Sequence, residues 1–306
     1  MVNRSLLVPT MESMVNYSKS PSFKSQSPFS PIEHVTARLV AFGPNDEIFV
    51  SGSCVRIAKN LYLTARHVVT DYLERFGHNP GEAKFTVWTI HVHPGPEYSI
   101  WEMDRLWLSP HSDLAVFHTM PYNDMAGAEK NTPSVGLNLT PPPIGSRIVG
   151  FGHHSASGRI RMGADGRKHI EVNTDGTATV GEVREIHPER RDSARLNFPC
   201  FRVNARFDGG MSGGPIFTDN GRLCGVICSS LPASSESEEH TSYATTLWPL
   251  MGLPIDVNPS PYRILEKPYP FIELARQQII HVNDLTQVSV QEGAVPGLYQ
   301  VRLQKR

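Results

Sequence analysis

The chain has 306 residues, of which 39% are hydrophobic and 19% charged, a composition typical of a globular protein rather than a disordered one. Lysine and arginine number 29 and aspartate and glutamate 30, so the net charge near −1 argues against a nucleic-acid-binding protein. No apolar stretch reaches the roughly 18 residues that a membrane-spanning helix requires.

The first segment, residues 1–32, is rich in serine and contains a single acidic residue, Glu12. It shows neither helical nor strand periodicity, so we expect a disordered arm. The apolar run Leu6–Val8 is too short for the core of a secretory signal, which favours a cytoplasmic location. The serine-rich, acid-poor composition leaves an organellar transit peptide as the alternative.

From 33 to 250, short apolar runs alternate with turns and no helical pattern intervenes, which predicts an all-β fold. A proline-rich break at 140–143 divides this region into a unit of about 33–125 and a unit of about 140–250. The strands expected in the two units are 38–42, 49–57, 61–64, 85–92 and 114–117, then 147–151, 169–173, 177–180, 200–204, 223–227 and 242–247.

Two further patterns complete this outline. Asn220-Gly221 lies between apolar runs and predicts a tight hairpin, because both residues tolerate positive φ. The extension 251–306 contains a helical pattern over 271–280, and its runs 288–290 and 298–303 predict a terminal hairpin.

The four cysteines, at 54, 200, 224 and 228, lack the spacing of a zinc site. Without a secretory signal, we expect them to be reduced and mostly buried. No metal site and no cofactor is predicted.

Three segments contain residues suited to nucleophilic catalysis. In Asp208–Pro215, four glycines surround Ser212, an arrangement that exposes backbone N–H groups and suits an oxyanion site. His67 follows the apolar run 61–64 and could act as the base that a serine hydroxyl requires. Asp113 precedes the apolar run 114–117 and could orient an imidazole.

In the order His, Asp, Ser, the motifs Thr-Ala-x-His-Val-Val, Ser-Asp-Leu-Ala-Val and Gly-x-Ser-Gly-Gly-Pro resemble those of trypsin-like serine peptidases. The disulfide-free HtrA/Deg branch of the chymotrypsin fold is the most similar. The resemblance covers about 33–250 and implies two antiparallel six-stranded β-barrels, followed by a C-terminal helix and a short extension. The catalytic residues would be His67, Asp113 and Ser212, and they would meet between the barrels.

The same resemblance implies secondary roles. The N–H groups of Gly210 and Ser212 would form the oxyanion hole. A strand carrying Cys228, Ser229 and Ser230 would bind the substrate backbone, with Cys228 standing where the family often has a serine. The specificity pocket would further include Arg206, Phe207 and Tyr243.

Two departures separate this chain from known branches. Met211 replaces the aspartate that secreted trypsins use to capture a freed N-terminus. The segment after Gly252 is too short for the PDZ domain of HtrA enzymes.

Three functions are compatible with these residues. The first is a serine endopeptidase that acts on a protein or peptide substrate through an acyl-enzyme. The second is a catalytically silent protease-fold binding module. The third is an α/β-hydrolase esterase, because Gly210–Gly214 also satisfies the nucleophile-elbow pattern Gly-x-Ser-x-Gly.

Overall fold

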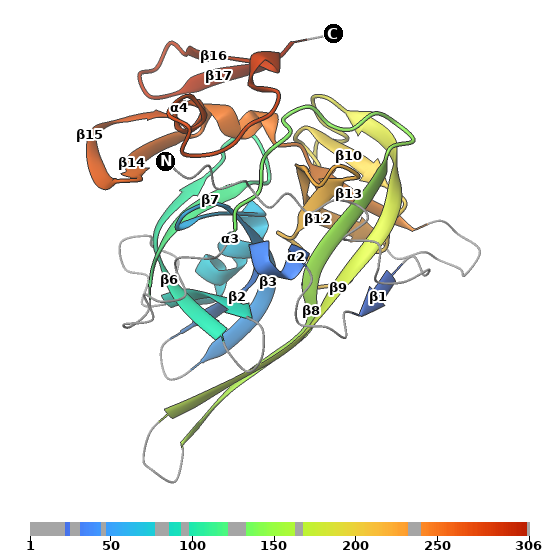
Figure 1. Ribbon diagram of the computed structural model, residues 1–306, viewed down its shortest axis with the longest axis vertical. Helices are drawn as coiled ribbons and strands as arrows, with labels where there is room; N and C mark the ends of the chain where they lie inside the picture. The colour runs from blue at the N-terminus through green and yellow to red at the C-terminus, as the bar shows by residue number, and fades with distance from the viewer. Residues whose placement is uncertain are drawn as a thin grey trace.

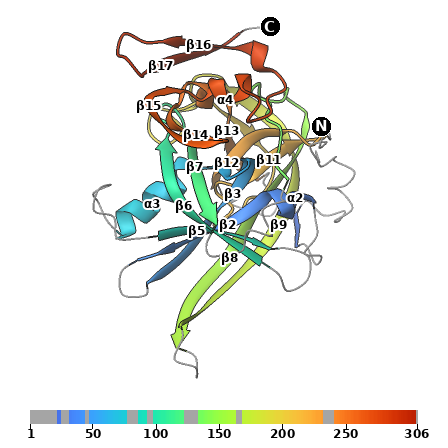
Figure 2. The ribbon, with the colours of Figure 1, turned by 60° about the vertical axis from the view of Figure 1, so that its left-hand side comes forward.

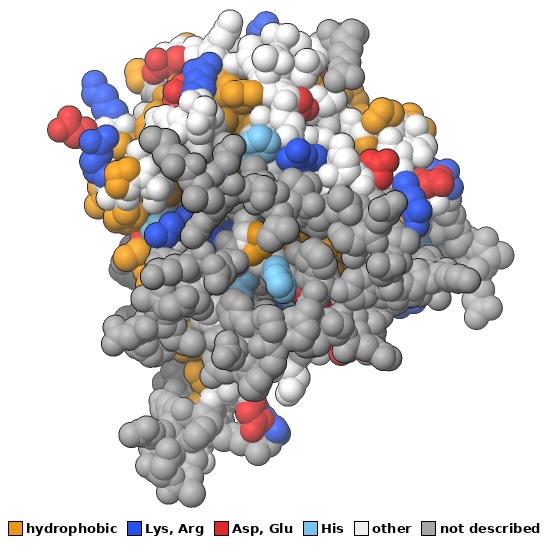
Figure 3. All heavy atoms as spheres, viewed as in Figure 1, with side chains coloured by type: hydrophobic (Ala, Val, Ile, Leu, Met, Phe, Trp, Pro, Cys, Tyr) orange, Lys and Arg blue, Asp and Glu red, His pale blue; other side chains and the backbone are white. Residues whose placement is uncertain are grey.

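The computed structural model describes residues 22–24, 31–43, 47–76, 86–92, 98–121, 133–162, 168–231 and 240–304. Over these residues the chain forms two β-barrels side by side, and two small hairpins lie together at one end (Figure 1). Lys and Arg side chains are interspersed with Asp and Glu side chains over the described part of the face in Figure 3. No helix within the described ranges is long and apolar enough to cross a membrane.

The first barrel is closed and antiparallel, in the order β2-β3-β4-β7-β6-β5. Two short helices accompany it: α2 (Pro31–Val35) precedes β2, and α3 (Arg66–Phe76) follows β4. Its strands are β2 (Thr36–Phe42), β3 (Ile48–Ala58), β4 (Leu61–Thr64), β5 (Thr86–Val92), β6 (Tyr98–Leu108) and β7 (Ala115–Pro121).

The second barrel runs in the order β8-β9-β10-β13-β12-β11, and its ring closes because β11 pairs with β8. All of these pairings are antiparallel. The strands are β8 (Arg147–Met162), β9 (Lys168–His187), β10 (Cys200–Val203), β11 (Pro215–Thr218), β12 (Leu223–Leu231) and β13 (Thr241–Thr245). The fold predicted from the motifs is thereby confirmed, and the α/β-hydrolase alternative, which needs a mainly parallel sheet, is wrong.

The C-terminal extension lies at one end of this pair of barrels (Figure 2). It shares a hydrophobic core with residues of both barrels. Val288 is buried in that core, and Val290, Val301 and Leu303 pack against it. The elements of the extension are η3 (Trp248–Gly252), β14 (Pro254–Pro259), β15 (Tyr262–Pro270), α4 (Ile272–Arg276), η4 (Leu285–Gln287), β16 (Val288–Glu292) and β17 (Tyr299–Leu303).

The structure corrects several details of the sequence outline. The arm predicted to be disordered contains strand β1 (Ser22–Lys24), which pairs with β9, and residues 1–21 and 25–30 lie outside the described residues. The helix predicted over 271–280 is only five residues long, and the positive φ of Gln278 (60°) prevents its continuation. The hairpin β14–β15 was not predicted. The terminal hairpin β16–β17 and the hairpin at Asn220-Gly221 are present, and all four cysteines are buried and free.

We predict that replacing Gly213 by alanine will strongly destabilise the joint between the barrels. Gly213 has φ of +83°, and a methyl carbon there would lie 2.2 Å from both the carbonyl oxygen of Ser53 and Oγ1 of Thr64. We expect thermal and denaturant unfolding to show that the free energy of unfolding falls by about 3 kcal/mol or more.

Gly145→Ala is the matched control, because Gly145 has nearly the same φ (+84°) but no heavy atom within 4 Å of the added methyl. Its free energy of unfolding should fall only by the cost of the backbone strain, about 1 kcal/mol. Equal stability losses for the two variants would contradict the packing that the structure shows.

Candidate active site

His67 lies at the start of α3, and the buried apolar face of this helix fixes its position. Val68, Val69 and Tyr72 are buried, so this side of the helix is fixed against the first barrel. The hydroxyl of Thr70 donates to the carbonyl oxygen of His67 (3.1 Å). The imidazole itself is 37% exposed, which leaves it open to the solvent side of the barrel.

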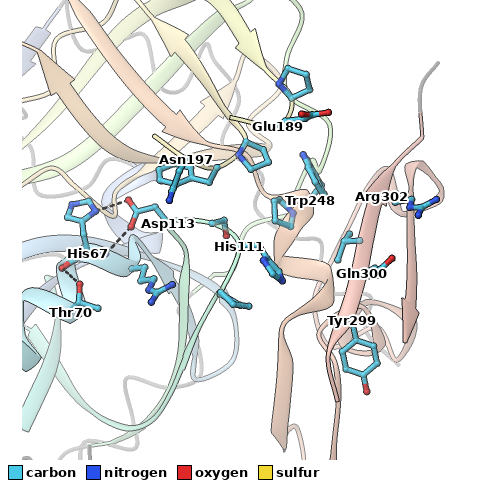
Figure 4. Close-up of a pocket in the computed structure, with 18 residues that line it drawn as sticks. His67, Thr70, His111, Asp113, Glu189, Asn197, Trp248, Tyr299, Gln300 and Arg302 are labelled. Atoms are coloured by element: carbon cyan, nitrogen blue, oxygen red, sulfur yellow. Dashed lines mark hydrogen bonds and ion pairs between the residues drawn. The ribbon is translucent and has the colours of Figure 1, made fainter. Parts of the chain in front are cut away.

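Asp113 binds His67 with both carboxylate oxygens (Figure 4). Its Oδ2 lies 2.7 Å from His67 Nδ1, and its Oδ1 accepts the backbone N–H of His67 at 2.9 Å. The carboxylate is nearly buried, so this two-point contact fixes both the ring and its backbone. An Nδ1–H that donates to Asp113 leaves Nε2 as the acceptor nitrogen, as a general base requires.

The environment raises the pKa of His67 above its ordinary value of 6.5. Burial is the largest influence and lowers the pKa, but the hydrogen bond and the charge of Asp113, with a contribution from Asp71, outweigh it. The ring is therefore a stronger base than a free histidine.

Ser212 belongs to the second barrel but is attached to the first. The N–H of Ser53 in β3 donates to the carbonyl oxygen of Ser212 (2.8 Å). The adjacent Gly213 packs directly against Thr64 and the backbone nitrogen of Ala65, two residues before the histidine. The two segments that carry Ser212 and His67 are thus in contact. Among the described residues, no hydrogen bond joins the hydroxyl of Ser212 to the imidazole; such bonds often form only when substrate is bound.

The turn before Ser212 contains a glycine in the left-handed region of the backbone map. Gly210 has φ of +97°, and the N–H of Met211 donates to the carbonyl oxygen of Asp208 (3.1 Å). Within the described part of the chain, the N–H groups of Gly210 and Ser212 donate to no protein acceptor. They are available to bind an oxyanion.

Ser53 is a site residue that sequence reasoning missed. Its side chain is completely buried, its Oγ accepts the N–H of His153 (2.8 Å), and it donates to the carbonyl oxygen of Gly210 at 3.4 Å. Its own carbonyl oxygen accepts the hydroxyl of Thr64 (2.7 Å). No sequence signal marks it, because a serine inside an apolar strand has no local pattern.

The predicted substrate strand is β12. Ser229 is half-buried and pairs with Tyr243 in β13, while Ser230 is exposed and its Oγ lies 3.1 Å from that of Ser242. The thiol of Cys228 donates to the carbonyl oxygen of Tyr243 (3.3 Å) rather than to the carboxylate of Asp113. Burial raises the pKa of this thiol.

Arg206 and Phe207, which were predicted near the base of a specificity pocket, lie in different surroundings. Phe207 is 3% exposed in the core of the second barrel, against Gly150, because its ring occupies the space that the glycine leaves. Arg206 is exposed and pairs with Asp208 at 2.7 Å. Their predicted role at the base of a specificity pocket stays a prediction.

The described residues include no group of three or more His, Cys, Asp or Glu side chains arranged to hold a metal ion.

A domain profile described as "trypsin-like peptidase domain" matches residues 52–226, more than half of the chain. The crystal structure of Deg5 aligns over 77% of this chain and 89% of its own, at 16% identity and a TM-score of 0.48. The active form of the Rv3671c protease from M. tuberculosis aligns over 78% and 90%, at 17% identity and a TM-score of 0.47. The HtrA-type protease AlgW, solved with a tripeptide, aligns over 72% and 58%, at 18% identity and a TM-score of 0.44. No curated protein sequence matches this chain.

We predict that the imidazole of His67 titrates above pH 6.5 and that Asp113→Asn lowers this midpoint to below 6.5, since burial then dominates. NMR titration of the ring protons measures both values. Asp71→Asn is the control and should shift the midpoint less, because Asp71 makes the smallest contribution.

The same shift has a consequence for stability. Because the pKa of His67 is higher in the folded protein than in the unfolded chain, the contact with Asp113 adds to the free energy of unfolding. This contribution is complete below pH 6.5 and is lost as the pH rises through the folded pKa. A His67 midpoint that does not respond to Asp113→Asn would contradict the contact described above.

Proposed function

The chain belongs to the trypsin-like peptidase family, and we propose that within it this protein is a serine endopeptidase that cleaves peptide bonds through an acyl-enzyme. The observation that carries the proposal is the double contact of Asp113 with His67, beside the segment that bears Ser212. A histidine oriented in this way, in a segment that contacts a glycine-rich turn carrying a serine, suits nucleophilic catalysis.

In the proposed reaction, Oγ of Ser212 attacks the carbonyl carbon of the scissile bond while Nε2 of His67 takes the hydroxyl proton. The N–H groups of Gly210 and Ser212 bind the negative oxygen of the tetrahedral intermediate. When the C–N bond breaks, the imidazolium gives its proton to the leaving amine. Water then attacks the carbonyl carbon of the acyl-enzyme, and His67 again takes the proton. The ester bond to Ser212 breaks, the imidazolium returns its proton to Oγ, and the acid product leaves.

Asp113 contributes by orientation and charge and is not itself protonated. Its carboxylate favours the imidazolium that forms in each step, which is the same effect that raises the pKa of His67. We therefore expect kcat/KM to rise with pH along an acid limb whose midpoint lies above 6.5.

We predict that a fluorophosphonate probe labels the wild-type protein and not Ser212→Ala, and that this variant loses peptide hydrolysis by on the order of 10⁶-fold. Labelling is followed by gel fluorescence, and the modified residue is identified by mass spectrometry. Ser193→Ala is the control because Ser193 is an exposed serine outside the site, and it should be labelled normally.

Two results would overturn the proposal. Equal labelling of wild type and Ser212→Ala would remove Ser212 from the nucleophile role. A correctly folded wild type that is neither labelled nor active would favour the protease-fold binding module.

A further inference from the structure

A cavity of about 760 Å³ extends from His67 and Asp113 to the C-terminal hairpin β16–β17. In Figure 4, His67 and Asp113 lie at one end, Gln300 and Arg302 at the other, and Trp248 lies between them. This volume is within the ~300–1,000 Å³ typical of ligand sites. A molecule in this cavity therefore lies beside the candidate catalytic pair.

The walls of the cavity have a distinct chemistry. Four prolines line it, at positions 110, 188, 199 and 249. Proline has no N–H, so these positions offer apolar ring surface and no backbone donors. Phe198 and Trp248 add aromatic surface. These rings give a bulky apolar side chain a surface to pack against, beside the polar side chains of Thr70, His111, Asn197 and Gln300.

Charged side chains of both signs line the cavity, so it does not favour a ligand of one charge. Arg66 and Arg302 line it together with Glu189. The guanidinium of Arg66 is already engaged, since it donates to the carbonyl oxygen of Ser109 (2.8 Å). This mixture does not suit a polyanion, and a peptide with an apolar side chain fits it better.

The wall at 188–199 is held in place by its own hydrogen bonds. Oδ1 of Asp192 accepts the N–H groups of Ala194, Arg195 and Leu196 at 2.9, 2.7 and 3.1 Å. A preformed wall of this kind loses little conformational entropy when a ligand binds.

The outer wall is also fixed to the body of the protein. Val301 in β17 packs against the core, and a methyl carbon at Gly252 of η3 would lie 2.4 Å from its Cγ2. The hairpin thus sits closely on η3, which also contributes Trp248 to the cavity.

We infer that this cavity is a second recognition site, which binds a bulky apolar side chain of the peptide substrate at a position away from the scissile bond. The C-terminal extension, which lies outside the matched residues 52–226, is then part of substrate recognition. The inference rests on the proposed function, because it takes the ligand to be the substrate whose scissile bond lies at Ser212.

The test uses the full-length Ser212→Ala protein, so that binding is measured without cleavage. Peptides that carry phenylalanine or glycine at successive positions on either side of a cleavage site are titrated by calorimetry. We expect phenylalanine at one position outside the scissile pair to bind about tenfold more tightly than glycine.

Two substitutions then locate the site. Asn197→Trp places a large side chain on an exposed lining residue and should abolish the phenylalanine preference by filling the cavity. Ala194→Trp is the matched control, because Ala194 is exposed in the same loop but does not line the cavity, and it should leave the preference intact. The fluorophosphonate labelling rate of otherwise wild-type Ala194→Trp should be unchanged, because Ala194 lies outside the cavity and outside the catalytic centre.

Equal binding of all the peptides, or equal effects of the two tryptophan substitutions, would overturn the inference even if the wild type hydrolyses peptides. Loss of labelling in the wild type, with the phenylalanine preference still present in Ser212→Ala, would instead overturn the proposed function and support the cavity as a peptide-binding site. The two failures are therefore distinguishable.

Discussion

The arrangement of the site depends on the hydrogen bonds of one buried serine at the joint between the barrels. Ser53 in β3 binds the carbonyl oxygen of Ser212 through its N–H and the backbone of Gly210 and His153 through its hydroxyl. These contacts join the first barrel to the glycine turn and to β8 of the second. Because a buried polar group without partners is costly, the barrels cannot shift at this point without breaking several hydrogen bonds at once. The position of the turn that carries Ser212 relative to the first barrel is thereby fixed by the backbone.

Each barrel contributes one part of the proposed active site. The first barrel builds the His67–Asp113 pair by itself, since α3 and the turn before β7 are both attached to it. The second provides the turn that carries Ser212, where the close packing of Gly213 admits no side chain. This division explains why the residues lie far apart in the sequence and why neither barrel could perform the proposed reaction alone. The C-terminal hairpin β16–β17 adds lining residues to the cavity beside the His67–Asp113 pair.

The sequence predicted those features that depend on local chemistry. The glycines around Ser212, the hairpin at Asn220-Gly221 and the short apolar strands each follow from one segment's own pattern. Features that depend on distant contacts were missed. Strand β6 was not predicted, because Glu102, Asp104 and Arg105 interrupt its apolar pattern. The ladder between β8 and β9 joins three runs that were predicted as separate strands. Ser53 and Phe207 take their roles from partners in other strands, which no local pattern reveals.

The central claim is that Ser212, His67 and the N–H groups of Gly210 and Ser212 act on a single carbonyl group. A crystal structure of the protein after reaction with a peptidyl phosphonate tests this most directly. We expect the phosphorus to be bonded to Oγ of Ser212, with the phosphoryl oxygen about 2.7–3.1 Å from both N–H nitrogens and Nε2 of His67 beside the adduct. An adduct on another residue, or a phosphoryl oxygen turned away from these N–H groups, would contradict the account.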